Sequence, residues 1–189
     1  PQVYLTSPQN QSYSNATANF NVTILEINAD TATLQLSRTG VSTNYSMTNK
    51  TGMWWYHNSS MAEGNYRAQV FASDTFGNQN ISELVYFTID RTIPAVATPP
   101  TINATSAANA TRLNITANVT DTYTNKTNLV VAASGDGGAH NVTLASRQAN
   151  LFQADTTPQA LYCPEGTCTI RIFATDSAGN VNQSEAVSI

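Results

Sequence analysis

The sequence is poor in charge, in sulfur and in long apolar runs. Charged side chains make up 11% of the 189 residues, against about 25% in a typical globular domain, and only two of them are lysines. A protein that grips a phosphate backbone needs a basic surface, so nucleic-acid binding is not expected. The longest purely apolar run, 129–133, is far too short to cross a bilayer, so direct membrane insertion is not expected either.

Small polar residues take the place of the missing charges. Asn, Thr and Ser number 21, 27 and 16, about a third of the chain, and the net charge is only −4. The apolar content of 41% lies in short alternating runs, which is enough to build cores and argues against disorder. This composition names no reaction, but it indicates the outside of a cell. The chain begins at Pro1 without a basic or apolar leader, so we expect a processed or excised segment.

One segment occurs twice. Residues 63–78 and 165–180 match without a gap at an offset of 102 residues, beginning with Glu-Gly and ending with Asp-x-x-Gly-Asn. A repeat of this length predicts two homologous units. We place them at 1–91 and 100–189, joined by a linker at 92–99.

The join between the units is rich in proline. Pro94, Pro99 and Pro100 lie within eleven residues of one another. Because proline has no backbone N–H and a fixed φ, these residues are expected to stiffen the linker and keep it out of a sheet.

Within each unit the apolar residues recur at every second position. Phe20, Val22 and Ile24 alternate with polar neighbours, and the same alternation runs through 32–37 and 113–120. A period of two is typical of half-buried strands. Short strands at roughly ten-residue spacing, in units near 95 residues, predict an all-β protein of two tandem sandwiches.

The repeated segment also carries a family resemblance. Glu-Gly-x-Tyr at 63–66 precedes the strand that ends in Asp-x-x-Gly-Asn, and Phe-Thr-Ile-Asp-x-Thr-x-Pro follows at 87–94. This arrangement resembles the Ig-like repeats of prokaryotic surface proteins. The resemblance implies immunoglobulin- or fibronectin-III-type modules, which are common in archaeal and bacterial surface layers, adhesins and filaments.

The same corner of the two units is predicted to be held by two different kinds of bond. Tyr66 lies where a tyrosine corner belongs, with its hydroxyl bonded to upstream backbone. Cys168 takes the same position in the second unit, and Cys163 lies five residues before it. We expect a Cys163–Cys168 disulfide to replace the tyrosine. A reactive thiol pair or a metal site is the alternative, but such a site would lack further ligands.

Asn-x-Ser/Thr sequons are strongly over-represented. Random placement would give about five, because 43 of the 189 residues are Ser or Thr, yet fourteen occur. We expect N-linked glycans at several of them. The candidate acceptors are Asn10, Asn15, Asn21, Asn44, Asn49, Asn58, Asn80, Asn103, Asn109, Asn114, Asn118, Asn125, Asn141 and Asn182.

A structural explanation competes at some of these positions. The sequon spacing of two is also the period of a strand, so strands with Asn and Thr outside generate sequons unaided. Asn21, Asn114, Asn118 and Asn141 fit that explanation. Eight others are predicted to lie in polar, turn-like stretches, where glycan acceptance is the better account. These are Asn10, Asn15, Asn44, Asn49, Asn58, Asn103, Asn109 and Asn125.

Acidic residues are few, and two of them occupy matching turns. Asp74 and Asp176 each begin Asp-x-x-Gly-Asn. Ca²⁺ ligation is one interpretation. We favour the other, a hairpin turn in which Asp caps backbone amides. Asp90 at the join would be a further oxygen ligand if calcium did bind between the units. We expect no cofactor.

No catalytic constellation is visible. His57 and His140 are the only histidines, and they do not match under the repeat. The glycine-rich segment 135–138 lacks the Lys-Ser/Thr of a phosphate loop and is interpreted as a hairpin loop. We therefore expect no catalytic and no metal-binding residues, and no enzyme.

Aromatic residues concentrate at Trp54, Trp55 and Tyr56. On a strand one tryptophan should face the core and the other the outside. The outer one would either stack on a sugar ligand or pack beneath a loop, the other unit or an attached glycan, and we favour packing. Phe71 and Phe173 share an outward phase and are candidate assembly contacts.

The sequence thus predicts a secreted, non-enzymatic, N-glycosylated structural or adhesive protein of a cell-surface layer, stalk or filament, archaeal by resemblance. Self-assembly or contact with other surface-protein domains is expected. Terminal segments such as 1–7 and 185–189 would suit donation of a strand to a neighbour. The alternative is a carbohydrate-binding or accessory module of a secreted enzyme, with a glycan as ligand.

Overall fold

The computed structural model describes residues 1–97, 99–125 and 127–189, and all its regular elements are strands. The chain divides into two compact units, Pro1–Arg91 and Thr92–Ile189. Among the described residues no helix is long and apolar enough to cross a membrane.

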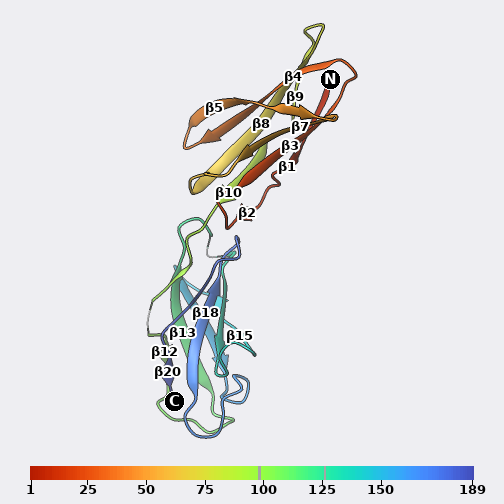
Figure 1. Cartoon of the computed structure of the whole chain (residues 1–189). Helices are drawn as coiled ribbons and strands as arrows, with labels where there is room; N and C mark the ends of the chain where they lie inside the picture. The colour runs from red at the N-terminus through yellow and green to blue at the C-terminus, as the bar shows by residue number, and fades with distance from the viewer. Residues whose placement is uncertain (98, 126) are drawn as a thin grey trace. The chain divides into compact units, whose positions relative to one another are not determined.

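The first unit consists of two sheets packed face to face, antiparallel except for one pair of strands (Figure 1). One sheet has the order β1 (Gln2–Ser7), β3 (Ala18–Leu25), β7 (Met53–Asn58), β6 (Thr48–Lys50). The other has the order β2 (Ser12–Tyr13), β10 (Val85–Ile89), β8 (Gly64–Asp74), β4 (Ala29–Arg38), β5 (Val41–Ser46), with β9 (Gln79–Ile81) also on β8. The first strand is thus split, and its second piece, β2, runs parallel to β10. This arrangement is an Ig-like sandwich.

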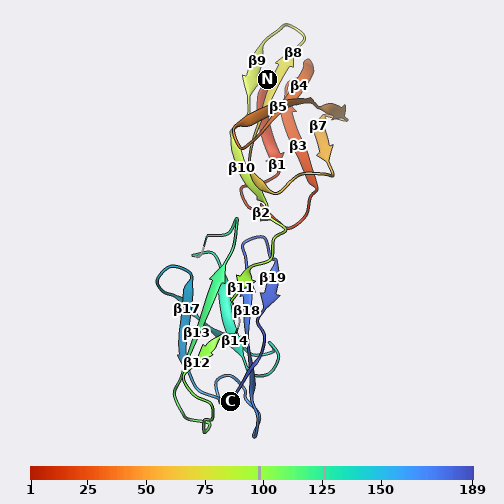
Figure 2. The same ribbon diagram turned by 90° about the vertical axis from the view of Figure 1, so that its left-hand side faces the viewer.

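The second unit repeats the design with shorter strands (Figure 2). One sheet has the order β11 (Ala95–Val96), β13 (Leu113–Thr120), β17 (Leu151–Thr156), β16 (Ala145–Ser146), with β12 (Thr101–Ile102) also on β13. The other has the order β15 (Val142–Thr143), β14 (Val130–Ser134), β18 (Thr169–Thr175), β19 (Val181–Gln183), with β20 (Val187–Ser188) also on β18.

The cores follow from the period of two. On β3, Phe20, Val22 and Ile24 are buried while the intervening residues face outward. On β13 the odd-numbered residues 113–119 are buried in the same way. Each buried Val, Leu, Ile or Phe side chain among them contributes about 1.5–3 kcal/mol when removed from water. The all-β sandwich prediction is confirmed.

Part of the proline-rich join belongs to a sheet, contrary to the prediction. Ala95 and Val96 form β11 and pair with Thr120 and Val119 of β13. The backbone N–H of Ala97 continues the ladder to the carbonyl of Asn118 at 2.8 Å. The prediction that this stretch stays out of a sheet is wrong, because the residues after Pro94 keep their backbone donors. Thr98 of the predicted linker lies outside the described residues.

Candidate glycan-acceptor surface

The fourteen sequon asparagines all lie at the surface. Ten are exposed, and Asn21, Asn58, Asn114 and Asn182 are half-buried. Lys126, the middle residue of the Asn125 sequon, lies outside the described residues. Exposure alone therefore does not separate the candidates, and the hydrogen bonds of each side-chain amide become the deciding observation.

Four of these amides are already committed to the fold. The Nδ2 atoms of Asn80, Asn114, Asn141 and Asn182 each donate a hydrogen bond to another protein group. N-glycosylation attaches the sugar to this nitrogen and leaves it one N–H, so a glycan there has to fit beside an acceptor that the fold already holds against the nitrogen. The other ten have no hydrogen bond from Nδ2 to any described residue. These ten are Asn10, Asn15, Asn21, Asn44, Asn49, Asn58, Asn103, Asn109, Asn118 and Asn125.

Asn80 and Asn182 occupy matching places in the two units. The Nδ2 of Asn80 lies 2.9 Å from the carbonyl oxygen of Pro1, and that of Asn182 lies 2.8 Å from the carbonyl oxygen of Pro94. Each amide therefore ties the start of its unit to the strand near the end of the unit.

The serines of the same two sequons are structural as well. Ser82 and Ser184 are both 2% exposed. The hydroxyl of Ser184 accepts the backbone N–H of Ile172 and donates to the carbonyl of Glu185, and Ser82 does the same between Val70 and Glu83. Each hydroxyl provides a hydrogen-bond acceptor for β8 or β18 at the point where backbone pairing with the last strand of the unit is interrupted. The internal repeat in the sequence shows that Ser82 and Ser184 occupy matching positions. The sequence alone does not show that their hydroxyls hydrogen-bond to buried backbone groups.

Asn114 belongs to a small charged cluster. Its Nδ2 and the guanidinium of Arg112 bind the two carboxylate oxygens of Asp155, at 2.8 and 2.7 Å. Both hydrogen bonds lower the pKa of Asp155, and the bond from the Asn114 amide has the larger effect. Here the sequon asparagine stabilises a carboxylate.

Three of the uncommitted sequons form tight local turns. The side-chain oxygen of Asn15 accepts the backbone N–H of Thr17, and Asn58 and Asn125 do the same with the Ser or Thr of their own sequons. Such a turn uses the oxygen and leaves the nitrogen free. The backbone thus presents an unbonded amide nitrogen at each of these positions.

Sequons also mark the free edges of the first unit. Asn44 lies on β5 and Asn49 on β6, so the prediction that these two lie in turn-like stretches is wrong. Each of the two strands is the last of its sheet. Every residue of β5 except Tyr45 is exposed. An exposed edge offers unpaired backbone groups to other chains, and charges usually prevent such pairing. In a chain with few charges, a glycan on the edge would do the same.

The two predicted clamps are present. The hydroxyl of Tyr66 donates to the carbonyl of Ala62 at 2.7 Å, and burial raises the pKa of this phenol, which keeps the donor protonated. In the second unit Cys163 and Cys168 form a disulfide, as predicted. Gly135 fits beneath it, since an added Cβ there would lie 2.9 Å from either sulfur.

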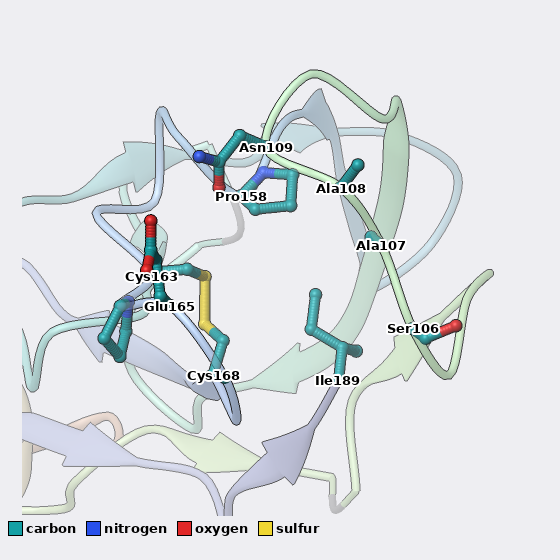
Figure 3. Close-up of a pocket in the computed structure, with 11 residues that line it drawn as sticks. Ser106, Ala107, Ala108, Asn109, Pro158, Cys163, Glu165, Cys168 and Ile189 are labelled. Atoms are coloured by element: carbon teal, nitrogen blue, oxygen red, sulfur yellow. A yellow bond between two sulfur atoms is a disulfide. The ribbon is translucent and has the colours of Figure 1, made fainter.

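A hollow of about 350 Å³ opens beside the disulfide (Figure 3). Ile189 and Pro158 line it with the two cysteines, and the side chain of Asn109 lies at its margin. Glu165 is the acidic residue of the lining.

The matching aspartates act as turn residues. Asp74 accepts the backbone N–H groups of Phe76 and Asn78 and the side-chain amide of Asn78. Asp176 makes the same bonds with Ala178 and Asn180. The amide of Asn78 is the main cause of a lowered pKa at Asp74. These contacts match the turn interpretation, while calcium binding stays an untested alternative.

The aromatic residues divide between the two faces of their sheet. Trp54 is buried at 7% exposure, while Trp55 lies on the outer face with the ammonium of Lys50 4.0 Å from its ring centre. Tyr56 faces inward and stacks on Tyr45.

The two phenylalanines with an outward phase differ from each other. Phe71 is 40% exposed at a shallow hollow on β8. Phe173 is half-buried, because the loop at Gly138 closes over its ring. Their role as assembly contacts stays a prediction, and it suits Phe71 better.

The histidines are both exposed. Nδ1 of His57 contacts the side-chain oxygen of Asn19 at 2.6 Å. His140 stacks on Tyr162 and pairs with Asp136, at 2.6 Å between Nδ1 and Oδ2. The glycine-rich segment 135–138 joins the paired strands β14 and β15, as a hairpin loop should.

The loop carboxylate gives an expected pH dependence. Hydrogen bonds from Ser134 and His140 lower the pKa of Asp136 well below its usual range. A depressed carboxyl pKa stabilises the fold above the unfolded value of about 3.9, and the contribution disappears as the pH falls further.

We expect Asp136→Asn to lower the melting temperature at pH 6. Between pH 6 and pH 3 the melting temperature of the variant should fall by less than that of wild type. Thermal unfolding monitored by circular dichroism at both values measures this. Asp30→Asn is the control, since the exposed Asp30 carboxylate makes no hydrogen bond to a described residue. An unchanged pH 6 to pH 3 difference in Asp136→Asn would contradict the assignment.

Comparison with known proteins places residues 6–91 in a recognised family model, the bacterial Ig-like domain. No curated protein sequence matches the chain significantly. Among solved structures, the fibronectin(III)-like modules of CbhA from Clostridium thermocellum align over 99% of this chain and 91% of theirs, with 16% identity and a TM-score of 0.52.

Two further structures align less closely. A tetra-tandem repeat of a large adhesion protein aligns with 99% of this chain and 47% of its own, at 17% identity and a TM-score of 0.41. The amphioxus IgVJ-C2 molecule aligns with 94% of this chain and 98% of its own, at 14% identity and a TM-score of 0.42. The Ig-like fold rests on the match of residues 6–91 to the bacterial Ig-like domain and on the likeness to the CbhA modules.

Proposed function

We propose that this chain is a non-enzymatic, N-glycosylated extracellular protein. It serves as a structural or adhesive part of a cell-surface layer, stalk or filament of a prokaryote, and we favour an archaeal source. The observation that carries the proposal is the set of ten surface sequons whose amide nitrogens make no hydrogen bond to any residue that the structure describes. The fold uses the amide nitrogens of only four of the fourteen. Strand periodicity alone does not account for the excess, because five of the other ten lie outside every strand, namely Asn10, Asn15, Asn103, Asn109 and Asn125.

Two further features support an extracellular location. The Cys163–Cys168 disulfide persists most readily in an oxidising compartment. The first unit matches a bacterial Ig-like domain, a module type often found outside the cell. The role of the sandwiches is mechanical: rigid units carry a hydrated sugar coat and present selected faces to neighbours.

Self-assembly is part of the proposal, but donation of a terminal strand is not. Residues 2–7 form β1 and pair with β3, and Val187–Ser188 pair with β18. Both segments thus complete their own units, so donating either would leave a gap behind. Contacts through exposed faces, such as the one around Phe71, are the alternative that we favour.

The test is the mass of the protein isolated from cells. We expect an intact mass well above the polypeptide value of 20.3 kDa, falling towards it after chemical deglycosylation. Electron micrographs of the same preparation should show a lattice or fibre. Protein of unmodified mass recovered from the cytoplasm would overturn the proposal.

A carbohydrate-binding or accessory module of a secreted enzyme is the second candidate. The half-exposed Trp55 supports it, since aromatic faces stack on sugar rings. Glycan-array binding by the unmodified protein that is lost in Trp55→Ala would favour this candidate.

A further inference from the structure

Asn21 and Trp55 lie opposite each other on the outer face of one sheet. Asn21 is on β3 and Trp55 on β7, and the antiparallel register pairs them directly. Figure 2 shows the two strands side by side. Directly opposed residues project on the same face, with Cβ atoms about 4.5–5.5 Å apart. A group bonded to the amide nitrogen of Asn21 therefore starts beside the indole ring.

The surroundings of Trp55 are incomplete without such a group. Its ring is half-exposed, and the ammonium of the exposed Lys50 lies 4.0 Å from the ring centre. Its indole N–H is covered, yet it has no hydrogen-bond partner among the described residues. The side-chain amide of Asn21 also makes no hydrogen bond to a described residue.

We propose that a glycan on Asn21 folds back over the sheet and that its first pyranose ring packs on Trp55. The inference rests on the proposed glycosylation. A pyranose presents C–H groups to the negative face of the indole, which is the attractive geometry for aromatic faces. The sugar displaces the flexible Lys50 side chain from the face of the ring.

The repeat provides a matched control. Asn118-Val119-Thr120 on β13 corresponds to Asn21-Val22-Thr23, and its amide is also uncommitted. Asn118 faces Leu151 of β17, so the side chain directly opposite this site is aliphatic and not aromatic. Any effect that belongs to glycan attachment in general should appear at both sites, and stacking should appear only at Asn21.

The experiment uses the glycoprotein purified from its own or another N-glycosylating host. Glycopeptide mass spectrometry first establishes which sequons are modified. Proton NMR then compares wild type with Thr23→Ala, Thr120→Ala and Trp55→Leu. We expect sugar C–H resonances shifted upfield by about half a part per million or more in wild type and Thr120→Ala. These shifts should disappear in Thr23→Ala, which lacks the glycan, and in Trp55→Leu, which keeps the glycan but lacks the ring.

The other outcomes overturn the inference in distinguishable ways. A modified Asn21 without ring-shifted sugar signals refutes the stacking alone. An unmodified Asn21 among otherwise occupied sequons refutes this site and leaves the proposed function standing. No modification at any sequon refutes both. Released glycan that restores the shifts when added to Thr23→Ala would make Trp55 a site for free carbohydrate and would also refute the inference.

Discussion

Replacing Ser184 with alanine should lower the free energy of unfolding of the second unit by about 1–3 kcal/mol. The hydroxyl accepts the buried N–H of Ile172, and alanine leaves that donor without an acceptor. Ser82→Ala should destabilise the first unit by a similar amount, because Ser82 accepts the N–H of Val70. Denaturant unfolding with an unchanged m-value measures both effects.

This prediction separates a structural serine from a sequon serine. Ser184→Ala also removes the Asn182 sequon, so a glycan-based effect would appear only in glycosylated protein. We expect the loss of stability to appear equally in unglycosylated protein made in a host without N-glycosylation. Ser146→Ala, at an exposed position on β16, is the control and should change stability by less than about 0.5 kcal/mol. A wild-type stability for unglycosylated Ser184→Ala would show that the hydroxyl is dispensable.

Removal of the disulfide should destabilise the second unit by about 2 kcal/mol. The bridge closes a loop with a sequence separation of five, and loop closure of that length gives an effect of this order. We expect Cys163→Ala/Cys168→Ala to unfold at lower denaturant concentration in the second unit only, since the first unit uses the Tyr66 clamp. Fluorescence of Trp54 and Trp55 reports the first unit, and near-ultraviolet circular dichroism reports both.

The tyrosine corner provides the comparison for this experiment. Tyr66→Phe removes the hydrogen bond to Ala62 and should cost the first unit about 1 kcal/mol. If the double cysteine variant unfolded like wild type, the two corners would not be equivalent clamps. An equal loss in both units would show that the disulfide acts on the whole chain.

The strands and cores could be predicted from the sequence because they depend on local alternation. Phe20 and Val22 are buried as the period of two requires, and the repeat places β18 and β19 on the pattern of β8 and β9. The disulfide was predictable because Cys168 replaces Tyr66 in a matched corner. The proline-rich join was mispredicted because its prolines flank Ala95 and Val96, whose backbone groups remain able to pair with β13.

The candidate site was only partly predictable. Sequon spacing identifies the acceptor asparagines, but it cannot show which amide nitrogens the fold uses. Asn80 bonds to Pro1 across a sequence separation of 79 residues, a contact that no local pattern records. The pairing of Asn21 with Trp55 likewise depends on register between strands that lie far apart in sequence.

Site-by-site glycopeptide mass spectrometry of the protein from its natural source tests the central claim most directly. The account predicts sugar on several of the ten asparagines with uncommitted amides and none on Asn80 and Asn182. Bare peptides at all fourteen positions, or full occupancy at Asn80 and Asn182, would contradict it.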